Sequence, residues 1–469
     1  MQVAQNLIGG VWRDTTGATV LDVVDPATEE VVARVPAGSP ADVDRAVEAA
    51  VAAQPGWASL SVAERVARIA EWADVITAHA DELAELERRE MGKPLALGRT
   101  FIEAAAAGMK SAAEAALSYA FEERFEHPDG ETRIVRHPLG ATAVITPWNF
   151  PLAVLLGSLG PLLAAGNTVV VKPSERSPLS AVRLCELLTL ADGVVNLVLG
   201  DARAGAPLAE HDGIQLVHFT GSVAAGRAVG AGAGRQLHRA MLELGGKDAV
   251  VVDADVDVRA TAAAVALGSF LNTGQICTSM ERIYVHQDIA AEFTEALVSA
   301  AEEYTPGEAL GPLVDARQRD IVREHVADAV ARGATIRTGG AEPPGKGYFY
   351  PPTVLTDVDE SMLVMTEETF GPIAPVAVVA DFAEGLERAA RSRFGLAATV
   401  YTHDPEHIEA ATRLPAGIVA VNQWQGGSAE MVWEPAGDSG MGATGAHAAY
   451  DAATRPSSVF IAGGGGPVS

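Results

Sequence analysis

The stretch "GATAVITPWNFPLAVLLGSLGPLLAAGNTVVVKP", residues 140–173, indicates the fold class of this chain most clearly. Two short runs rich in Val, Ile and Thr lie on either side of an apolar segment, residues 150–166. The runs are apolar throughout rather than alternating, which is typical of strands with both faces covered. A helix between two such strands predicts parallel pairing, so the stretch predicts a βαβ unit.

The same alternation continues along the chain. "GVVNLVLG" and "IQLVHFTGS" are strand-like, and a helical pattern, "SPLSAVRLCELLTL", precedes them. After Gly245 further strands are expected in "AVVVD", "RIYVH", "GATIRTGG", "FGLAATVYTH" and "GIVAVN", with helices around residues 257–271 and 288–303. The sequence therefore predicts an α/β protein with two doubly wound, Rossmann-like α/β domains.

The remaining segments complete the predicted organisation. "LDVVDPATEEVVARVP" predicts short strands around a turn, and Pro40 to about Glu123 shows helical spacing of apolar residues. Ser61 followed by Glu64 predicts a capping box. "ETRIVRHPLG" and "SSVFIAG" stand apart as strands. We expect one domain from residues 1–124 and 140–244, a second from 245–435, and a small β arm from 125–139 and 455–469.

Composition excludes several classes of protein. Of the 469 residues, 48% are hydrophobic and 20% charged, which is typical of a soluble globular protein with two or more domains. The net charge is −27, from 34 basic and 61 acidic residues, which argues against nucleic acid and anionic membranes as partners. The apolar segment 150–166 is short for a membrane span and contains Pro161, and the N-terminus has no signal-peptide pattern, so we expect a cytoplasmic protein.

The chain has two cysteines, Cys185 and Cys277. No CxxC, Cys/His cluster or HExxH motif is present, so we expect no metal site. Cys185 occurs at helical spacing among leucines, as a core residue would. Cys277 ends "NTGQIC", where flexible neighbours allow either a nucleophile or an inert buried thiol.

Four further stretches place reactive side chains at strand or helix ends. Asn149 in "ITPWNFP" is an amide donor or a turn residue. In "VVKPSE", Lys172 and Glu175 either hold sugar hydroxyls at the carboxyl edge of the sheet or form a solvated pair. "FTGSVAAG" predicts a phosphate-binding helix start or a simple tight turn. In "LELGGKD", the Glu243 carboxylate could activate water near Cys277.

Together these stretches resemble the aldehyde dehydrogenase superfamily. "PWNFP", "KPSE", "FTGS", "LELGGK", "GQIC" and "EETFGP" occur in that family's order, and the resemblance runs from about residue 5 to about residue 460. It implies oxidation of a small-molecule aldehyde to the carboxylic acid with NAD, or alternatively NADP, as the cofactor. It also implies a homodimer or homotetramer joined through the arm strands.

The resemblance implies a role for each matching residue. Cys277 is the implied nucleophile, Glu243 the general base, and Asn149 the oxyanion donor together with the Cys277 backbone N–H. The cofactor is expected to contact Trp148, Lys172, Ser174, Glu175, Gly221, Ser222, Leu244, Glu368 and Phe370. Glu243 favours hydrolysis of the acyl intermediate, because relatives that transfer the acyl group to coenzyme A generally lack this residue. Glu175 favours NAD, because its carboxylate would repel a 2′-phosphate.

Two departures from the family pattern limit what the resemblance implies. Val223 stands where many relatives have Thr, and "VNQWQGGSAEMVWEPAGDSGMGATG" replaces a "PFGGxKxSG" stretch. Trp424 and Trp433 in this segment line an aromatic-tolerant pocket or belong to the core. The aldehyde is left open, and a coenzyme A-acylating semialdehyde dehydrogenase and a catalytically silent NAD-binding relative remain as alternatives.

Overall fold

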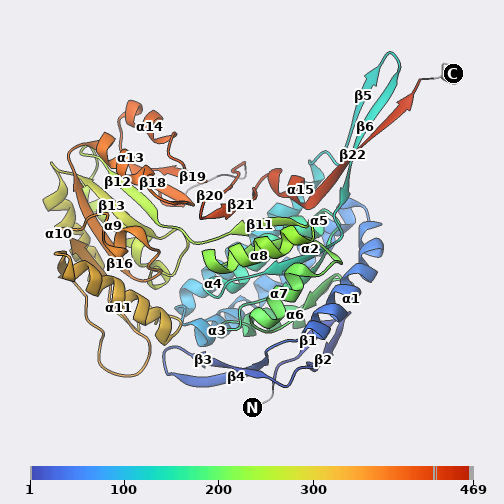
Figure 1. Ribbon diagram of the computed structural model, residues 1–469, viewed down its shortest axis with the longest axis horizontal. Coiled ribbons are helices and arrows are strands. Elements are labelled where there is room, and N and C mark those ends of the chain that lie inside the picture. Colours follow the sequence, from blue (N-terminus) through green and yellow to red (C-terminus); the bar gives the residue numbers. More distant parts are fainter. Residues whose placement is uncertain (1–2, 426–427, 429, 464–469) are drawn as a thin grey trace.

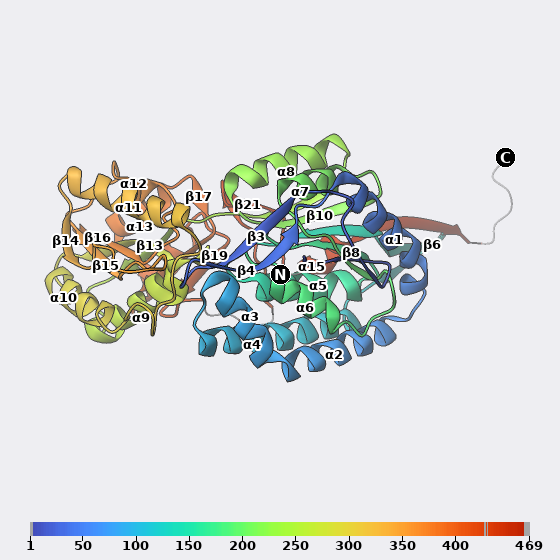
Figure 2. The ribbon, with the colours of Figure 1, turned by 90° about the horizontal axis from the view of Figure 1, so that it is seen from below.

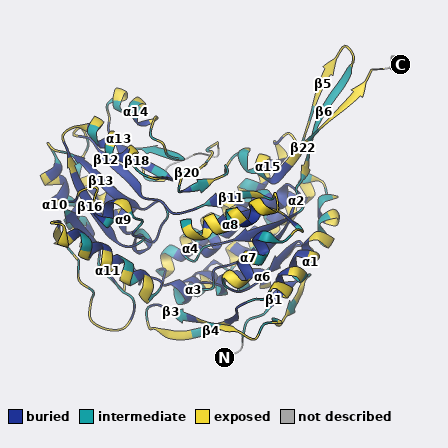
Figure 3. Ribbon diagram, in the orientation of Figure 1, coloured by how far each residue is buried: buried dark blue, intermediate teal, exposed yellow. Residues whose placement is uncertain are grey.

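The structure is a computed structural model that describes residues 3–425, 428 and 430–463. Two open sheets of mainly parallel strands form its centre, one on each side of Figure 1, and a slender arm projects from one end. Figure 3 shows that the inner strands of both sheets are buried, whereas much of the arm is exposed. The predicted α/β class with two doubly wound sheets is therefore confirmed.

The first sheet contains the unit predicted from residues 140–173. Among the described residues its strands lie in the order β2 (Val11–Arg13), β1 (Asn6–Ile8), β9 (Val195–Leu197), β8 (Thr168–Lys172), β7 (Ala141–Ile145), β10 (Ile214–Thr220), β11 (Arg239–Glu243) and β21 (Gly440–Met441). The strands from β9 to β11 are parallel, and the outer strands pair antiparallel. The chain reverses direction across the sheet between β7 and β10, which is where ligands bind in sheets of this kind.

Helices cover both faces of this sheet (Figure 2). One face packs against α1 (Pro40–Ala58), α7 (Ala202–Glu210) and α8 (Val223–Arg235). The other packs against α2 (Val62–Ala78), α3 (Ala80–Met91), α4 (Leu95–Glu114), α5 (Pro151–Ala164), α6 (Leu179–Glu186) and α15 (Ala448–Ala453). On β8, Val169 and Val171 face the second helix layer and Val170 the first. Both faces of the sheet are buried under helices, which explains why apolar and polar residues do not alternate along the strand.

The second sheet is built in the same way. Its order among the described residues is β14 (Thr335–Thr338), β15 (Thr353–Thr356), β16 (Ile373–Val379), β13 (Met280–His286), β12 (Asp248–Val252), β18 (Ala397–Tyr401) and β19 (Ile418–Val421). Only β14 pairs antiparallel within this described part. One face packs against α9 (Val258–Phe270) and α10 (Ala290–Ala301), the other against α11 (Ala316–Ala331), α12 (Leu363–Thr366), α13 (Phe382–Ala390) and α14 (Pro405–Ala411). The strands β15 and β16 are not among those expected from the sequence.

Smaller elements complete the fold. β3 (Val20–Asp25) and β4 (Glu30–Pro36) form the predicted strand pair, and β17 (Phe394–Gly395) pairs with β20 (Ala436–Gly437). Two short 3-10 helices are η1 (Ala115–Leu117) and η2 (Leu271–Gly274). The capping box at α2 is confirmed, since the Ser61 hydroxyl accepts the Glu64 N–H and the Glu64 carboxylate accepts the Ser61 N–H. No helix in the described part of the chain is both long and apolar enough to cross a membrane.

The arm is a three-stranded antiparallel sheet of β5 (Glu122–His127), β6 (Gly130–Pro138) and β22 (Thr454–Ala462), with β6 in the centre. It starts three residues before the expected segment 125–139, and residues 464–469 of the expected arm lie outside the described residues. β21 belongs to the first sheet although it lies beyond the residues expected there. The division into domains stays a prediction.

Core packing around α5 should dominate stability. Leu155 is fully buried on this helix, whereas Leu267 on α9 is 43% exposed. We expect Leu155→Ala to lower the free energy of unfolding by about 2–5 kcal/mol, because the lost methyl groups leave a cavity. Leu267→Ala, the matched control, should leave the melting temperature nearly unchanged. Differential scanning calorimetry checks both, and equal losses in the two variants would contradict the packing described.

Candidate active site

A cavity of about 790 Å³ follows the carboxyl ends of the first sheet and reaches the loops of the second. All predicted site residues line it: Trp148, Asn149, Lys172, Ser174, Glu175, Gly221, Ser222, Glu243, Leu244, Cys277, Glu368 and Phe370. They come together because parallel pairing brings the strand ends into register, with Ile145 opposite Lys172 and Thr220 opposite Glu243. The structure thus assembles in one place residues that are far apart in the sequence.

The loop that carries Cys277 has an unusual backbone. Asn272, Thr273 and Gly274 have φ angles of 51°, 61° and 68°, in the left-handed region. A Cβ atom at Gly274 would collide with the Gly371 carbonyl, so glycine is required for this close approach. The loop therefore packs tightly on the segment that follows Phe370.

Amide side chains hold this loop in place. The Gln275 side-chain oxygen accepts the Val314 N–H at 2.9 Å, and its Nε2 donates to the Asn272 carbonyl at 3.2 Å. Asn149 Nδ2 donates to the Gln275 carbonyl at 3.0 Å, and Asn149 is buried. One of the two Asn149 amide hydrogens is used in this bond, which leaves the second for another acceptor.

Cys277 and Glu243 form a coupled pair. Burial raises the pKa of Glu243 to about 7, and a hydrogen bond from the Cys277 thiol acts in the opposite direction. Burial raises the pKa of Cys277 well above its usual value, and the Glu243 charge and hydrogen bond raise it further. Glu243 Oε1 is buried without a hydrogen-bond partner among the described residues. A carboxylate that titrates near neutral pH beside a thiol can act as a general base.

The first turn of α8 forms one wall of the cavity. Ser222 caps this helix, and its hydroxyl accepts the Ala225 N–H at 3.4 Å. A Cβ atom at Gly226 would collide with Leu244, whose side chain packs against this turn. Gly221 donates its N–H to the Glu243 carbonyl at 3.0 Å, which ties the helix start to the end of β11. A helix N-terminus in a cavity suits a phosphate group.

Lys172, at the end of β8, also lines the cavity. Its ammonium donates to the carbonyls of Pro173 and Gly200 at 2.8 Å each, and burial lowers its pKa. The Glu175 carboxylate is 3.9 Å away and more exposed, and the Ser174 hydroxyl accepts the Arg176 N–H at 3.3 Å. Hydroxyl groups of a sugar could pair with this carboxylate and ammonium.

Glu368 and Phe370 approach from the second sheet. Glu368 Oε1 accepts the Gly246 N–H at 2.9 Å, and burial, followed by the nearby Glu281, raises the pKa of Glu368 to about 8. The Phe370 ring meets the edge of Trp148, with ring centroids 5.4 Å apart. Both residues line the cavity together with Cys277.

Comparison with known proteins identifies the family. The model of the aldehyde dehydrogenase family matches residues 12–459. The chain belongs to the aldehyde dehydrogenase family. This membership confirms the predicted class, an oxidoreductase that acts on small-molecule aldehydes with a nicotinamide dinucleotide.

Three relatives illustrate the similarity. A 3,6-anhydro-alpha-L-galactose dehydrogenase from Streptomyces coelicolor is 39% identical over 431 residues, which cover 89% of this chain and 88% of that protein. A glutarate-semialdehyde dehydrogenase from Pseudomonas aeruginosa is 36% identical over 430 residues, which cover 89% of each. The NAD+ complex of an aldehyde dehydrogenase from Bacillus cereus has a TM-score of 0.95 at 32% identity, covering 98% of this chain and 97% of that chain.

Sequence reasoning missed several residues of this aldehyde dehydrogenase site. Arg176 forms an ion pair with Asp315 at 3.1 Å, and Gln318 donates to the Thr369 and Phe370 carbonyls. Lys247 and Glu281 form an ion pair beneath the loop that carries Thr369 and Phe370. The available signal is the presence of charged residues in a largely apolar strand, as with Glu281 and Arg282 in "MERIYVH".

The two tryptophans of the atypical segment occupy different places. Trp424 Nε1 donates to the carbonyl of Thr278, the residue after Cys277, at 3.0 Å. The Trp433 backbone bridges to Thr444 instead. Neither lines the 790 Å³ cavity. The neighbouring positions 426–427 and 429 of the atypical segment lie outside the described residues.

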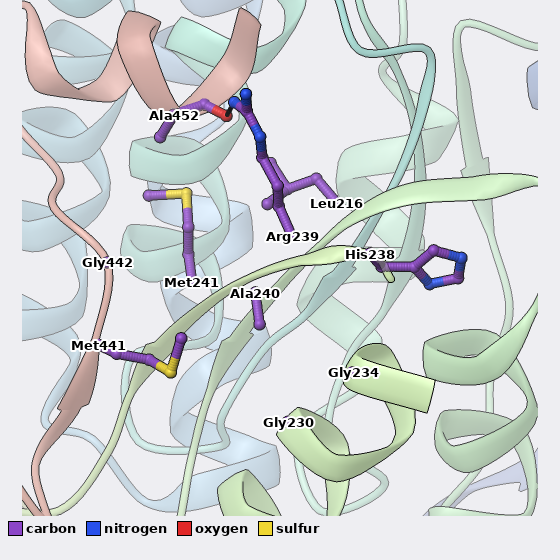
Figure 4. Close-up of a pocket in the computed structure, with 10 residues that line it drawn as sticks. All are labelled: Leu216, Gly230, Gly234, His238, Arg239, Ala240, Met241, Met441, Gly442 and Ala452. Atoms are coloured by element: carbon purple, nitrogen blue, oxygen red, sulfur yellow. Dashed lines mark hydrogen bonds between the residues drawn. The ribbon is translucent and has the colours of Figure 1, made fainter. Parts of the chain in front are cut away.

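A second cavity, of about 440 Å³, lies between α8, β11, β21 and α15 (Figure 4). Met241 and Met441 from neighbouring strands line it together with Arg239, whose guanidinium donates to carbonyls of the 451–454 segment. None of the predicted site residues lines this cavity. It is therefore separate from the candidate active site.

The coupling of Cys277 and Glu243 can be measured. Glu243→Gln should lower the pKa of the Cys277 thiol, because a neutral side chain removes the charge that disfavours the thiolate, although burial remains. The rate of iodoacetamide alkylation plotted against pH should shift to lower pH in this variant. Cys277→Ala is the control and should incorporate no label, since burial raises the pKa of Cys185 to about 12. An unchanged profile would show that the two groups do not interact.

Proposed function

We propose that this aldehyde dehydrogenase is hydrolytic, with Cys277 as nucleophile, Glu243 as general base and Asn149 as oxyanion donor. The observation that carries the proposal is the half-buried Glu243, which lines the same cavity as Cys277 and whose buried Oε1 has no hydrogen-bond partner among the described residues. One carboxylate can thus serve both the thiol and a water molecule.

The first step is addition of the thiol to the aldehyde. Glu243 takes the thiol proton, and Cys277 Sγ bonds to the carbonyl carbon. The oxygen becomes an oxyanion that accepts hydrogen bonds from the Asn149 amide and the Cys277 backbone N–H. Loss of one such donor typically costs about 3 kcal/mol of transition-state stabilisation.

Oxidation and hydrolysis follow. NAD+, when bound, supplies the hydride acceptor. Loss of hydride from the thiohemiacetal carbon leaves a thioester on Cys277. Once Glu243 has released the thiol proton to solvent, it takes a proton from the water molecule that attacks the thioester carbon. The carboxylic acid leaves as this proton passes from Glu243 to the Cys277 sulfur, which restores the thiol. The net reaction converts aldehyde, NAD+ and water into acid, NADH and a proton.

The cavity fits a dinucleotide. The first turn of α8 with Gly221, Ser222 and Leu244 suits the pyrophosphate. Lys172, Ser174 and Glu175 are proposed to hold the adenosine ribose, and Trp148, Glu368 and Phe370 the nicotinamide half. We propose that NAD is preferred over NADP, because the Glu175 carboxylate would repel a 2′-phosphate.

The domain division and compartment are part of the proposal. Residues 1–124 and 140–244 would bind the cofactor, and residues 245–435 would carry the nucleophile. Among the described residues both cysteines are free thiols. A nucleophilic thiol has to stay reduced, which supports a cytoplasmic location.

The test is a screen for NADH formation with NAD+ and NADP+ over aliphatic, aromatic, sugar and carboxylated aldehydes. Turnover with at least one aldehyde is expected, with the higher kcat/KM for NAD+. Cys277→Ala should lower kcat by a factor on the order of 10³ or more, and Glu243→Ala by about 10²–10⁴.

Three outcomes would contradict the proposal in different ways. Activity that survives in Cys277→Ala would exclude this nucleophile. Acceleration by coenzyme A, with turnover retained in Glu243→Ala, would indicate acyl transfer to coenzyme A. No turnover with any aldehyde would indicate a catalytically silent relative.

We further propose that the arm joins subunits in a homodimer or homotetramer. Val459, Phe460 and Ile461 on β22 are exposed, and Phe460 is 60% exposed. β22 and β5 are the edge strands of the arm, and unprotected apolar edges favour association. Light scattering should therefore give a mass of at least two subunits, and Phe460→Lys should lower it. A monomeric native protein would refute this role of the arm.

A further inference from the structure

A buried ion pair lies beneath the loop that carries Glu368 and Phe370. Lys247 Nζ and Glu281 Oε2 are 2.6 Å apart, and the two side chains are 1% and 3% exposed. Removing one partner of such a pair leaves an uncompensated buried charge, which is strongly unfavourable. A pair of this kind fixes the position of both side chains.

Glu281 also holds the backbone of the loop. Its Oε2 accepts the Thr369 N–H and its Oε1 accepts the Phe370 N–H, both at 2.8 Å. Lys247 Nζ donates to the Thr369 hydroxyl at 3.2 Å. One carboxylate thus receives two consecutive backbone N–H groups and an ammonium, and charge-assisted hydrogen bonds of this type are strong.

The loop needs this support because its backbone is strained. Phe370 has a φ angle of 52°, in the left-handed region. Such a conformation costs about 1–3 kcal/mol and persists only where its surroundings impose it. Gln318 Nε2 donates to the Thr369 and Phe370 carbonyls at 2.9 and 3.1 Å. Glu281 therefore holds the N–H groups of these two residues, and Gln318 holds their carbonyl groups.

The pair also connects the loop to both catalytic segments. Lys247 lies four residues after Glu243, and Glu281 lies four residues after Cys277. Lys247 immediately precedes β12, and Glu281 is the second residue of β13. These two strands pair with each other, with Asp248 opposite Met280. A shift of the pair would therefore move the loop relative to the nucleophile.

We propose that Lys247 and Glu281 are positioning residues that set Phe370 and Glu368 against the nicotinamide half of the cofactor. The inference rests on the function proposed above. It separates two parts of the reaction: hydride transfer depends on the pair, whereas attack by Cys277 on a carbonyl carbon does not. An activated ester such as p-nitrophenyl acetate isolates the second part, because its hydrolysis requires the thiol and the base but no cofactor.

The test compares these two reactions in Glu281→Gln, which keeps the shape of the side chain and removes its charge. For aldehyde oxidation, kcat/KM for NAD+ should fall by about 10- to 100-fold, as expected when a reacting group is misplaced by about 1 Å. Ester hydrolysis without cofactor should stay within about twofold of the native rate. NADH binding should weaken. Binding of AMP should not change, because the proposed function places its ribose at Lys172, Ser174 and Glu175, away from the loop.

Two further variants separate positioning from general instability. Asp253→Asn changes a partly buried contact of the second sheet, in which Asp253 pairs with His407 at 2.6 Å, and it should retain both reactions. Lys247→Met combined with Glu281→Gln removes both charges. This double variant should melt at a higher temperature than Glu281→Gln while its NAD+-dependent rate stays low.

The outcomes are distinguishable. Equal losses of ester hydrolysis and aldehyde oxidation in Glu281→Gln would overturn the positioning role, as would an unchanged kcat/KM for NAD+. Recovery of the NAD+-dependent rate in the double variant would show that the unpaired charge, not the lost backbone contacts, caused the defect. Native protein that hydrolyses the ester but forms no NADH with any aldehyde would instead contradict the proposed function.

Discussion

Parallel pairing of the strands β7, β8, β10 and β11 is the constraint on which this site depends. Parallel strands end at the same edge of a sheet, so Lys172, Thr220 and Glu243 reach one cavity from separate parts of the chain. The second sheet presents Cys277 and Phe370 to the same space. Covering both faces of each sheet with helices keeps the strand ends fixed, and this rigidity allows a buried carboxylate to face a thiol.

Much of this fold could be predicted from the sequence, and the elements that could not be predicted have a physical reason. The unit at residues 140–173 was recognised because its strands are short, apolar and rich in Val and Thr. β16, a central strand of the second sheet, was missed. It contains Pro375, which cannot donate to a neighbouring strand and argues against a strand in the sequence. Its place is determined by burial between β15 and β13, which is a tertiary effect.

The site was predictable to a different degree. Cys277, Glu243 and Asn149 were identified by an ordered set of motifs, not by the local chemistry of each residue. Lys247 ends the motif "LELGGK", but neither it nor Glu281 is given a role by the motifs. Their partners on the loop are the Thr369 hydroxyl, 122 positions from Lys247, and the Thr369 N–H, 88 positions from Glu281. When a residue positions a loop through hydrogen bonds to distant parts of the chain, the sequence shows only a charged residue in or beside an apolar strand.

The electrostatic field around Cys277 follows from this architecture. The carboxylates of Glu243, Asp248 and Glu368 each act to raise the pKa of the thiol, in addition to burial. A protonated thiol is a poor nucleophile and resists oxidation. In the proposed mechanism, the Cys277 thiol therefore stays protonated until its proton passes to Glu243.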